Sequence, residues 1–198
     1  HNSAPVAGGI FGDSVNRVDS SLVYSNSATT HAAGVRRCLV KNSTVADNLL
    51  GPLSVHASEA LPDPLTAAEV DRLVQTYAGV GSGIHEVNGT LENDIVVGNT
   101  AFGTLMFEGE GTDEVSFANA ALDIDVRAYG ASVVNSALDV RMLAGVSGTW
   151  TGDPSVVFTA SSNLFVNAAQ ADYRLLATAP VLDLAELLPG YSTTDIEG

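Results

Sequence analysis

The chain has 198 residues, enough for one domain with a sizeable core. Its 23 acidic and 8 basic residues give a formal net charge of −15, a balance that disfavours binding to nucleic acids and anionic membranes. The mean hydropathy is +0.20, yet no run of 18 apolar residues occurs, so this segment contains no candidate membrane span. The single cysteine, Cys38, excludes an intrachain disulfide.

A repeat runs through the first half of the chain. Residues 21–26 return 22 positions later as residues 43–48, and a third copy follows at residues 94–99; each copy ends in asparagine. At the same spacing Gly12 aligns with Gly34. Residues 2–4 resemble residues 26–28, so the chain is expected to open partway through a coil of a longer precursor. Self-similarity at a period near 20 is typical of solenoids.

Aligned positions of the copies carry aliphatic side chains, which should stack about 4.8 Å apart in the core. One column is Val18, Val40 and Leu91, and the other is Val23, Val45 and Val96. Their neighbours Leu22 and Thr44 should face outward. Asn26, Asn48 and Asn99 should end the strands and form a side-chain ladder. The sequence therefore predicts an all-β fold, a right-handed parallel β-helix, as a single domain over residues 1–198.

An insertion separates the second and third copies, because Asn48 and Asn99 lie 51 residues apart, which is not a multiple of 22. Thr66 and Glu69 have the spacing of a helix capping box, and an apolar stripe at helical spacing surrounds them. The pattern predicts one short helix over residues 66–77, within a lateral excursion over residues 52–88. After Asn99 the alternation at residues 115–117, 121–126 and 132–140 indicates further strands.

The tail carries the most specific motifs. They are Asp153-Pro154, Asn163-Leu164-Phe165-Val166-Asn167, Asp172-Tyr173-Arg174-Leu175, Ala179-Pro180-Val181-Leu182-Asp183 and Asp195-Ile196-Glu197-Gly198. Together with the repeat at residues 42–48, they resemble secreted bacterial right-handed parallel β-helix proteins of the pectate-lyase-like superfamily, notably repeat-rich surface proteins with varied C-terminal anchors. The resemblance implies that residues 153–198 form the closing segment of the fold and that more chain follows Gly198. It says little about activity, because this superfamily holds lyases, hydrolases, epimerases, adhesins and phage spikes.

One basic cluster stands out in the acidic chain. Arg36, Arg37 and Lys41, the last being the only lysine, lie within one repeat. A polysaccharide lyase needs a base and a positive charge beside the substrate carboxylate, so Lys41 and Arg37 are the candidate catalytic residues. Arg36 and Arg37 are neighbours on a predicted strand, however, and should point to opposite faces. Outward charges of this kind are also common on structural surfaces.

Two acidic features could bind a cation or do acid–base work. Four carboxylates and two glycines occur between residues 108 and 114, and oxygen ligands on a glycine-containing loop suit Ca²⁺. The candidate ligands are Glu108, Glu110, Asp113 and Glu114, although their order differs from that of an EF-hand. Asp123 and Asp125 share one face of a strand, but the apolar residues between them indicate ordinary polar-out alternation. Cys38 is expected to be a buried, unreactive side chain.

No catalytic set is intact in the sequence. The expected function is therefore an extracellular structural, adhesive or self-assembling module of a bacterial surface or secreted protein. Its partners would be other copies of itself or other surface proteins, with polysaccharide as a further candidate, and Ca²⁺ is the favoured metal if the chain binds one. The alternative is a carbohydrate-active enzyme, a polysaccharide lyase acting on an acidic polymer.

Overall fold

The computed structural model describes residues 2–13, 15–86, 90–108, 113–125, 132–144 and 155–182. One sheet has the order β1 (Ser3–Ala4), β5 (Ser27–Ala28), β9 (Leu49–Ala57), β13 (Thr100–Phe107) and β14 (Asp113–Ala121). A second has the order β10 (Ile84–His85), β6 (Val35–Arg36) and β2 (Ile10–Phe11). A third has the order β15 (Ser132–Val134), β11 (Thr90–Glu92), β7 (Leu39–Lys41) and β3 (Arg17–Asp19). A fourth has the order β17 (Val156–Thr159), β16 (Ser136–Asp139), β12 (Ile95–Val97), β8 (Thr44–Ala46) and β4 (Leu22–Tyr24).

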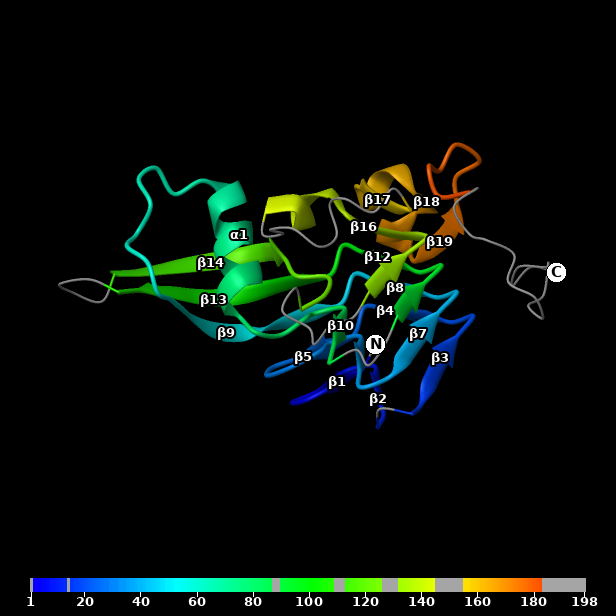
Figure 1. The fold of residues 1–198 in the computed structure, drawn as a ribbon, viewed down its shortest axis with the longest axis horizontal. Helices are drawn as coiled ribbons and strands as arrows, with labels where there is room; N and C mark the ends of the chain where they lie inside the picture. The colour runs from blue at the N-terminus through cyan, green and yellow to red at the C-terminus, as the bar shows by residue number, and fades with distance from the viewer. Residues whose placement is uncertain are drawn as a thin grey trace.

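Successive repeats pair in parallel, and the three repeats that begin at β2, β6 and β10 each contribute one strand to each of these four sheets (Figure 1). Val23 pairs with Val45 and Val45 with Val96, so the predicted aliphatic column is confirmed. Both columns lie in one buried cluster. In the second sheet the spacing is 25 residues rather than 22, because Ile10 pairs with Val35. The alignment of Gly12 with Gly34 is therefore wrong.

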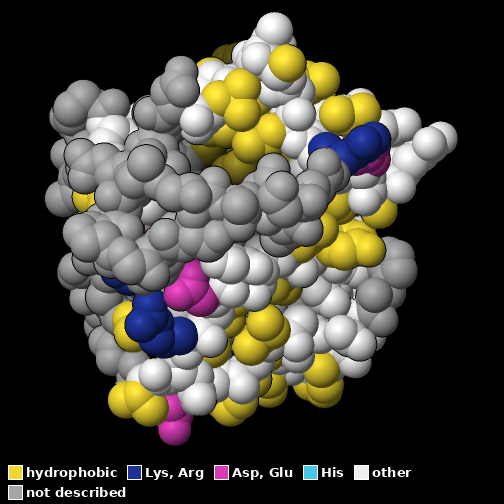
Figure 2. Space-filling view, turned by 90° about the vertical axis from the view of Figure 1, so that its right-hand side faces the viewer, with side chains coloured by type: hydrophobic (Ala, Val, Ile, Leu, Met, Phe, Trp, Pro, Cys, Tyr) yellow, Lys and Arg dark blue, Asp and Glu magenta, His cyan; other side chains and the backbone are white. Residues whose placement is uncertain are grey.

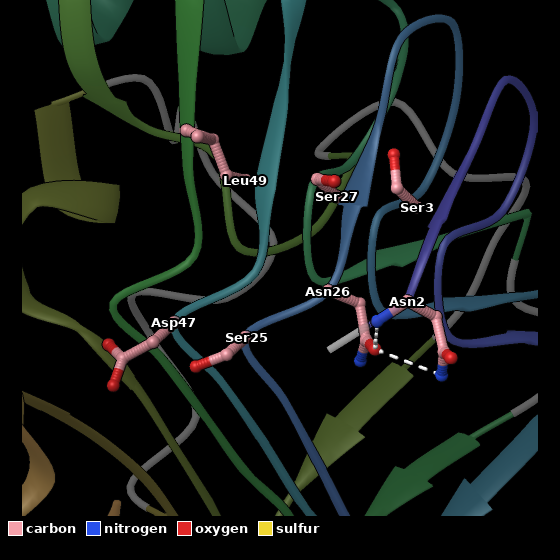
Figure 3. A pocket seen from close by; sticks show the side chains of 7 residues that line it. All are labelled: Asn2, Ser3, Ser25, Asn26, Ser27, Asp47 and Leu49. Atoms are coloured by element: carbon pink, nitrogen blue, oxygen red, sulfur yellow. Dashed lines mark hydrogen bonds between the residues drawn. The ribbon is translucent and has the colours of Figure 1, made fainter. Parts of the chain in front are cut away.

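The predicted asparagine ladder is confirmed. The Asn26 amide donates to Asn48 Oδ1 at 3.1 Å, and the Asn48 amide donates to Asn99 Oδ1 at 2.8 Å. Figure 3 shows Asn2 beside Asn26, to whose Oδ1 it donates its backbone N–H at 3.0 Å. The ladder ends in Asp123, whose Oδ1 accepts from the Asn99 amide at 2.9 Å. These side chains satisfy backbone groups at the corners, which would otherwise be buried without partners.

Three corners of the repeat are marked by residues with positive φ. Between the third and fourth sheets these residues are Ser20, Asn42, Asn93 and Asn135. Between the fourth and first sheets they are Ser25, Asp47 and Gly98. Short polar residues and glycine tolerate the left-handed conformation best, which accounts for these residue types. The same conformation at Arg37 and Glu86 makes the corner after the second sheet.

The predicted helix is confirmed as α1 (Ala67–Tyr77), and the Thr66 hydroxyl accepts from Glu69 N at 3.2 Å as the capping box requires. Leu73 and Val74 are fully buried in the cluster that α1 forms with β9, β13 and β14. Figure 1 shows these three strands extending beyond the rest of the molecule, with α1 across them. α1 thus packs into a second buried cluster, which also contains Ala28 and Ala33 of the repeats.

The fold class is corrected by these elements: a single all-β parallel β-helix is wrong. Among the described residues the structure is mixed α/β, with one α-helix, several separate parallel sheets, and antiparallel pairs at β13–β14 and at β18 (Phe165–Asn167) with β19 (Asp172–Leu175). The physical reason is that segments between the repeats bury apolar faces of their own. Alternation within a repeat predicts its strands but does not predict how such inserted segments fold.

The described part of the C-terminal segment lies over the outward face of the fourth sheet. Its 3₁₀ turns at Ser161–Asn163 and Ala168–Gln170 flank β18, and another 3₁₀ turn, Val140–Ala144, follows β16. Leu164 and Phe165 join Val97 and Ala137 in a buried cluster. Two of the tail motifs used for the resemblance, at 153–154 and 195–198, lie outside the described residues. None of the described helices is long and apolar enough to cross a membrane.

Candidate functional site

Lys41, the candidate base, lies on β7 with its side chain outward. Its Nζ lies 2.5 Å from Glu92 Oε2 on the neighbouring strand β11, and the two side chains are 26% and 17% exposed. The ion pair engages the Lys41 ammonium group with a carboxylate of the chain itself. The geometry therefore does not favour Lys41 as a general base.

Arg37, the candidate carboxylate clamp, shares one acceptor with Arg36. Glu86 Oε2 lies 2.9 Å from Arg36 Nε and 2.6 Å from Arg37 Nε. The expectation that the two arginines point apart is wrong, because the positive φ of Arg37 breaks the alternation of the strand. The Arg36 hydrogen bond, supported by Arg37, lowers the pKa of Glu86 to about 2. Lys41 and Arg37 thus belong to two separate ion pairs, each with a carboxylate of the chain.

Replacing Glu86 with glutamine should destabilise the fold by about 2 kcal/mol, because Arg36, whose side chain is 11% exposed, loses a charged acceptor. Arg37→Ala should cost less than about 1 kcal/mol, since Arg37 is half exposed. A depressed pKa means that the Glu86 contribution is present above pH 4.5 and is lost as pH falls towards 2. Urea unfolding at pH 7 compares the two variants, and equal losses of stability would contradict the first statement. Urea unfolding at pH 3 tests the second, since the loss caused by Glu86→Gln should be smaller there than at pH 7.

A histidine pair lies beside this ion pair. The rings of His31 and His85 are 5.4 Å apart, and His85 Nδ1 lies 3.6 Å from Asp125 Oδ2. His85 is 5% exposed and its Nδ1 has no hydrogen-bond partner among the described residues, while burial lowers the pKa of both histidines. The Thr30 hydroxyl donates to the Pro5 carbonyl, so it accepts from His31 Nδ1. This assigns the proton of neutral His31 to Nδ1.

The arrangement brings together groups that the sequence does not connect. His31 precedes β6, His85 ends β10, and Asp125 follows the isolated bridge between Ile84 and Ile124. Asp125 was expected to be an outward, solvated residue, but it is 5% exposed beside His85. The neutral rings can accept protons in acid. The described residues contain no group of three histidine, cysteine or acidic side chains placed to hold a metal ion.

The predicted calcium ligands are only partly described. Asp113 and Glu114 begin β14, and Glu108 follows β13; all three are exposed. Glu110 lies outside the described residues. Calcium binding at this turn stays a prediction. Cys38, in contrast, is confirmed as a buried side chain at 1% exposure, and burial raises the pKa of its thiol.

A shallow depression of about 330 Å³ lies at the corner between the fourth and first sheets (Figure 3). It is lined by Asn2, Ser3, Ser25, Asn26, Ser27, Asp47 and Leu49. The Asp47 carboxylate points away from Ser3 and Ser27, and its Oδ2 accepts the Tyr173 hydroxyl at 2.6 Å. Burial raises the pKa of Asp47. The most polar group of the depression is thus engaged with the C-terminal segment.

On the face shown in Figure 2, basic side chains lie beside acidic ones, as Lys41 and Arg37 do in their ion pairs. Comparison of the chain with known protein families, curated proteins and solved structures gave no match. The resemblance to pectate-lyase-like surface proteins therefore stays a prediction.

Proposed function

We propose that the chain is an extracellular structural or adhesive module of a bacterial surface or secreted protein, rather than an enzyme. One observation carries the proposal: the basic side chains that a lyase would direct at its substrate are bound to carboxylates of the chain itself. Parallel pairing and the asparagine ladder join successive repeats into one body, which suits a load-bearing or spacing role.

Self-association is the assembly mode that the strand order supports. In the described residues β1, β2, β3 and β4 each have a hydrogen-bonded neighbour on one side only. All four lie within the first 24 residues, so they form the same end of the stack of repeats. Such edges pair readily with a further strand, either of a preceding repeat or of another chain. The partners would be other copies of this chain or other surface proteins.

Sedimentation velocity over a hundredfold range of protein concentration tests the assembly role. We expect larger species to grow with concentration. Electron microscopy of the same samples should show particles joined end to end. A strictly monomeric particle at every concentration would argue against self-assembly.

The enzyme alternative has its own test. We expect no unsaturated uronate product, measured by absorbance, when the protein is incubated with pectate, alginate or chondroitin, with and without Ca²⁺. Product formation that is lost in Arg37→Ala and Lys41→Ala, but kept in the exposed control Arg174→Ala, would overturn the structural proposal and establish a lyase.

A further inference from the structure

Two aspartates take part in internal ladders where the neighbouring repeats carry neutral side chains. Asp123 continues the column of Asn26, Asn48 and Asn99: its Oδ1 accepts from Asn99 N, and its Oδ2 accepts from Asp139 N at 2.8 Å. A second ladder consists of Ser21, Ser43, Asp94 and Ser136. Ser21 N donates to Ser43 Oγ, Ser43 N to Asp94 Oδ1, and Asp94 N to Ser136 Oγ.

Both carboxyl groups are buried, and no cationic side chain of the described residues forms an ion pair with either. Asp123 is 0% exposed and Asp94 is 1% exposed, and neither takes part in an ion pair in the described part of the chain. The charged group that acts most on Asp123 is another carboxylate, Asp139. Asp94 faces Asp19, which opposes its ionisation, and Lys41, which favours it but is held by Glu92. Removing an unpaired carboxylate from water is costly, so burial favours the protonated form.

We propose that Asp94 and Asp123 make the stack of repeats pH-sensitive, so that it is tightest in acid and loosens as both carboxyl groups ionise around neutral pH. Both oxygens of each carboxyl group accept N–H hydrogen bonds, Asp94 from Ser43 and Glu92 and Asp123 from Asn99 and Asp139, and these bonds stabilise the carboxylate. Burial opposes them, because two carboxylates place net negative charge inside the ladders. Asp123 links Asn99, which follows β12, to Asp139 at the end of β16. Asp94, at the corner after β11, is linked to Ser43 just before β8 and to Ser136 at the start of β16. The later repeats are therefore the ones that loosen. This inference does not depend on the structural role proposed above.

The pKa values agree with this geometry. Burial, opposed by the hydrogen bonds that each group accepts, raises the pKa of Asp94 to about 7 and that of Asp123 to about 8. An aspartate of the unfolded chain has a pKa of about 3.9. Between these values the folded state binds more protons than the unfolded state, so the free energy of unfolding falls as pH rises. The loss is complete only above about pH 8.

Substitutions that copy the neighbouring repeats test the proposal. Asp123→Asn reproduces Asn99, and Asp94→Ser reproduces Ser43 and Ser136; Asp63→Asn, at an exposed position, is the control. Urea unfolding is measured from pH 5 to pH 9. The ratio of the folding constant of each variant to that of the wild type should rise by up to about tenfold per pH unit between pH 5 and pH 7. Comparing ratios removes the contributions of groups that are common to both proteins.

A direct titration keeps the proposal testable if a variant fails to fold. The carboxyl ¹³C shifts of Asp94 and Asp123 in the wild-type protein should change between pH 6 and pH 9. Amide exchange in β12 and β16 should accelerate over the same range more than exchange in β3 and β4. Titration of both carboxyl groups below pH 5, or variant ratios that do not change with pH, would overturn the proposal.

Discussion

Asn48→Ala should lower the free energy of unfolding by about 4 kcal/mol, because it removes the middle of the asparagine ladder. Asn48 is fully buried, and its amide donates to the Val23 carbonyl as well as to Asn99. Its Oδ1 accepts both the backbone N–H and the amide of Asn26. Alanine would leave several of these groups buried without partners, and each such group costs about 1–3 kcal/mol.

Asn2→Ala provides the matched control for this prediction. Asn2 belongs to the same ladder but is exposed, and its amide is 3.4 Å from Asn26 Oδ1. Its removal should cost less than about 1 kcal/mol. Urea unfolding of the two variants beside the wild type measures the difference. Similar small losses for both would show that the ladder contributes little to stability.

Gly34→Ala should cost about 3 kcal/mol or prevent folding, because the ladder leaves no space for a methyl group at this position. A Cβ atom at Gly34 would lie 2.4 Å from the Gly83 carbonyl oxygen and 3.0 Å from Asn48 Nδ2. The obstacle is backbone that parallel pairing holds in register on both sides. Relief would require the second sheet to separate from the ladder.

Gly12→Ala is the comparison for this effect. A Cβ at Gly12 would meet side-chain atoms, namely Cys38 Sγ at 2.6 Å and atoms of Asn16. All of these are side-chain atoms rather than paired backbone, and Asn16 lies at the surface, so the loss should be smaller than for Gly34→Ala even though Cys38 is buried. Thermal unfolding followed by circular dichroism separates the two cases; a larger loss at Gly12 would contradict the argument.

The sequence predicted the repeat body more accurately than the whole fold. Residues that recur at one spacing occupy equivalent positions: Val23 pairs with Val45, and Asn26 is hydrogen-bonded to Asn48. The Thr66 capping signal was local, so α1 could also be predicted. The antiparallel β13–β14 pair and the packing of Phe165 on the fourth sheet depend on contacts between distant segments, which alternation within a strand does not encode.

The candidate site was predicted less well for the same reason. Arg37 was assigned to a strand, but its positive φ places it at a corner, where Glu86 from the next repeat binds it. Asp123 was expected to be solvated because it alternates with apolar residues, yet the column of Asn99 buries it. Alignment of Asp123 with the asparagine column was the signal that could have identified it.

The position of α1 in the sequence, between β9 and β10, has a consequence for how the chain tolerates change. The excursion leaves after β9 and rejoins before β10, and the third repeat still pairs with the second in the same register. Segments of different length could therefore be exchanged at residues 60–64, away from the Thr66 cap of α1, while the ladders stay intact. A foreign peptide or small tag carried there would be displayed without disturbing the body that supports it.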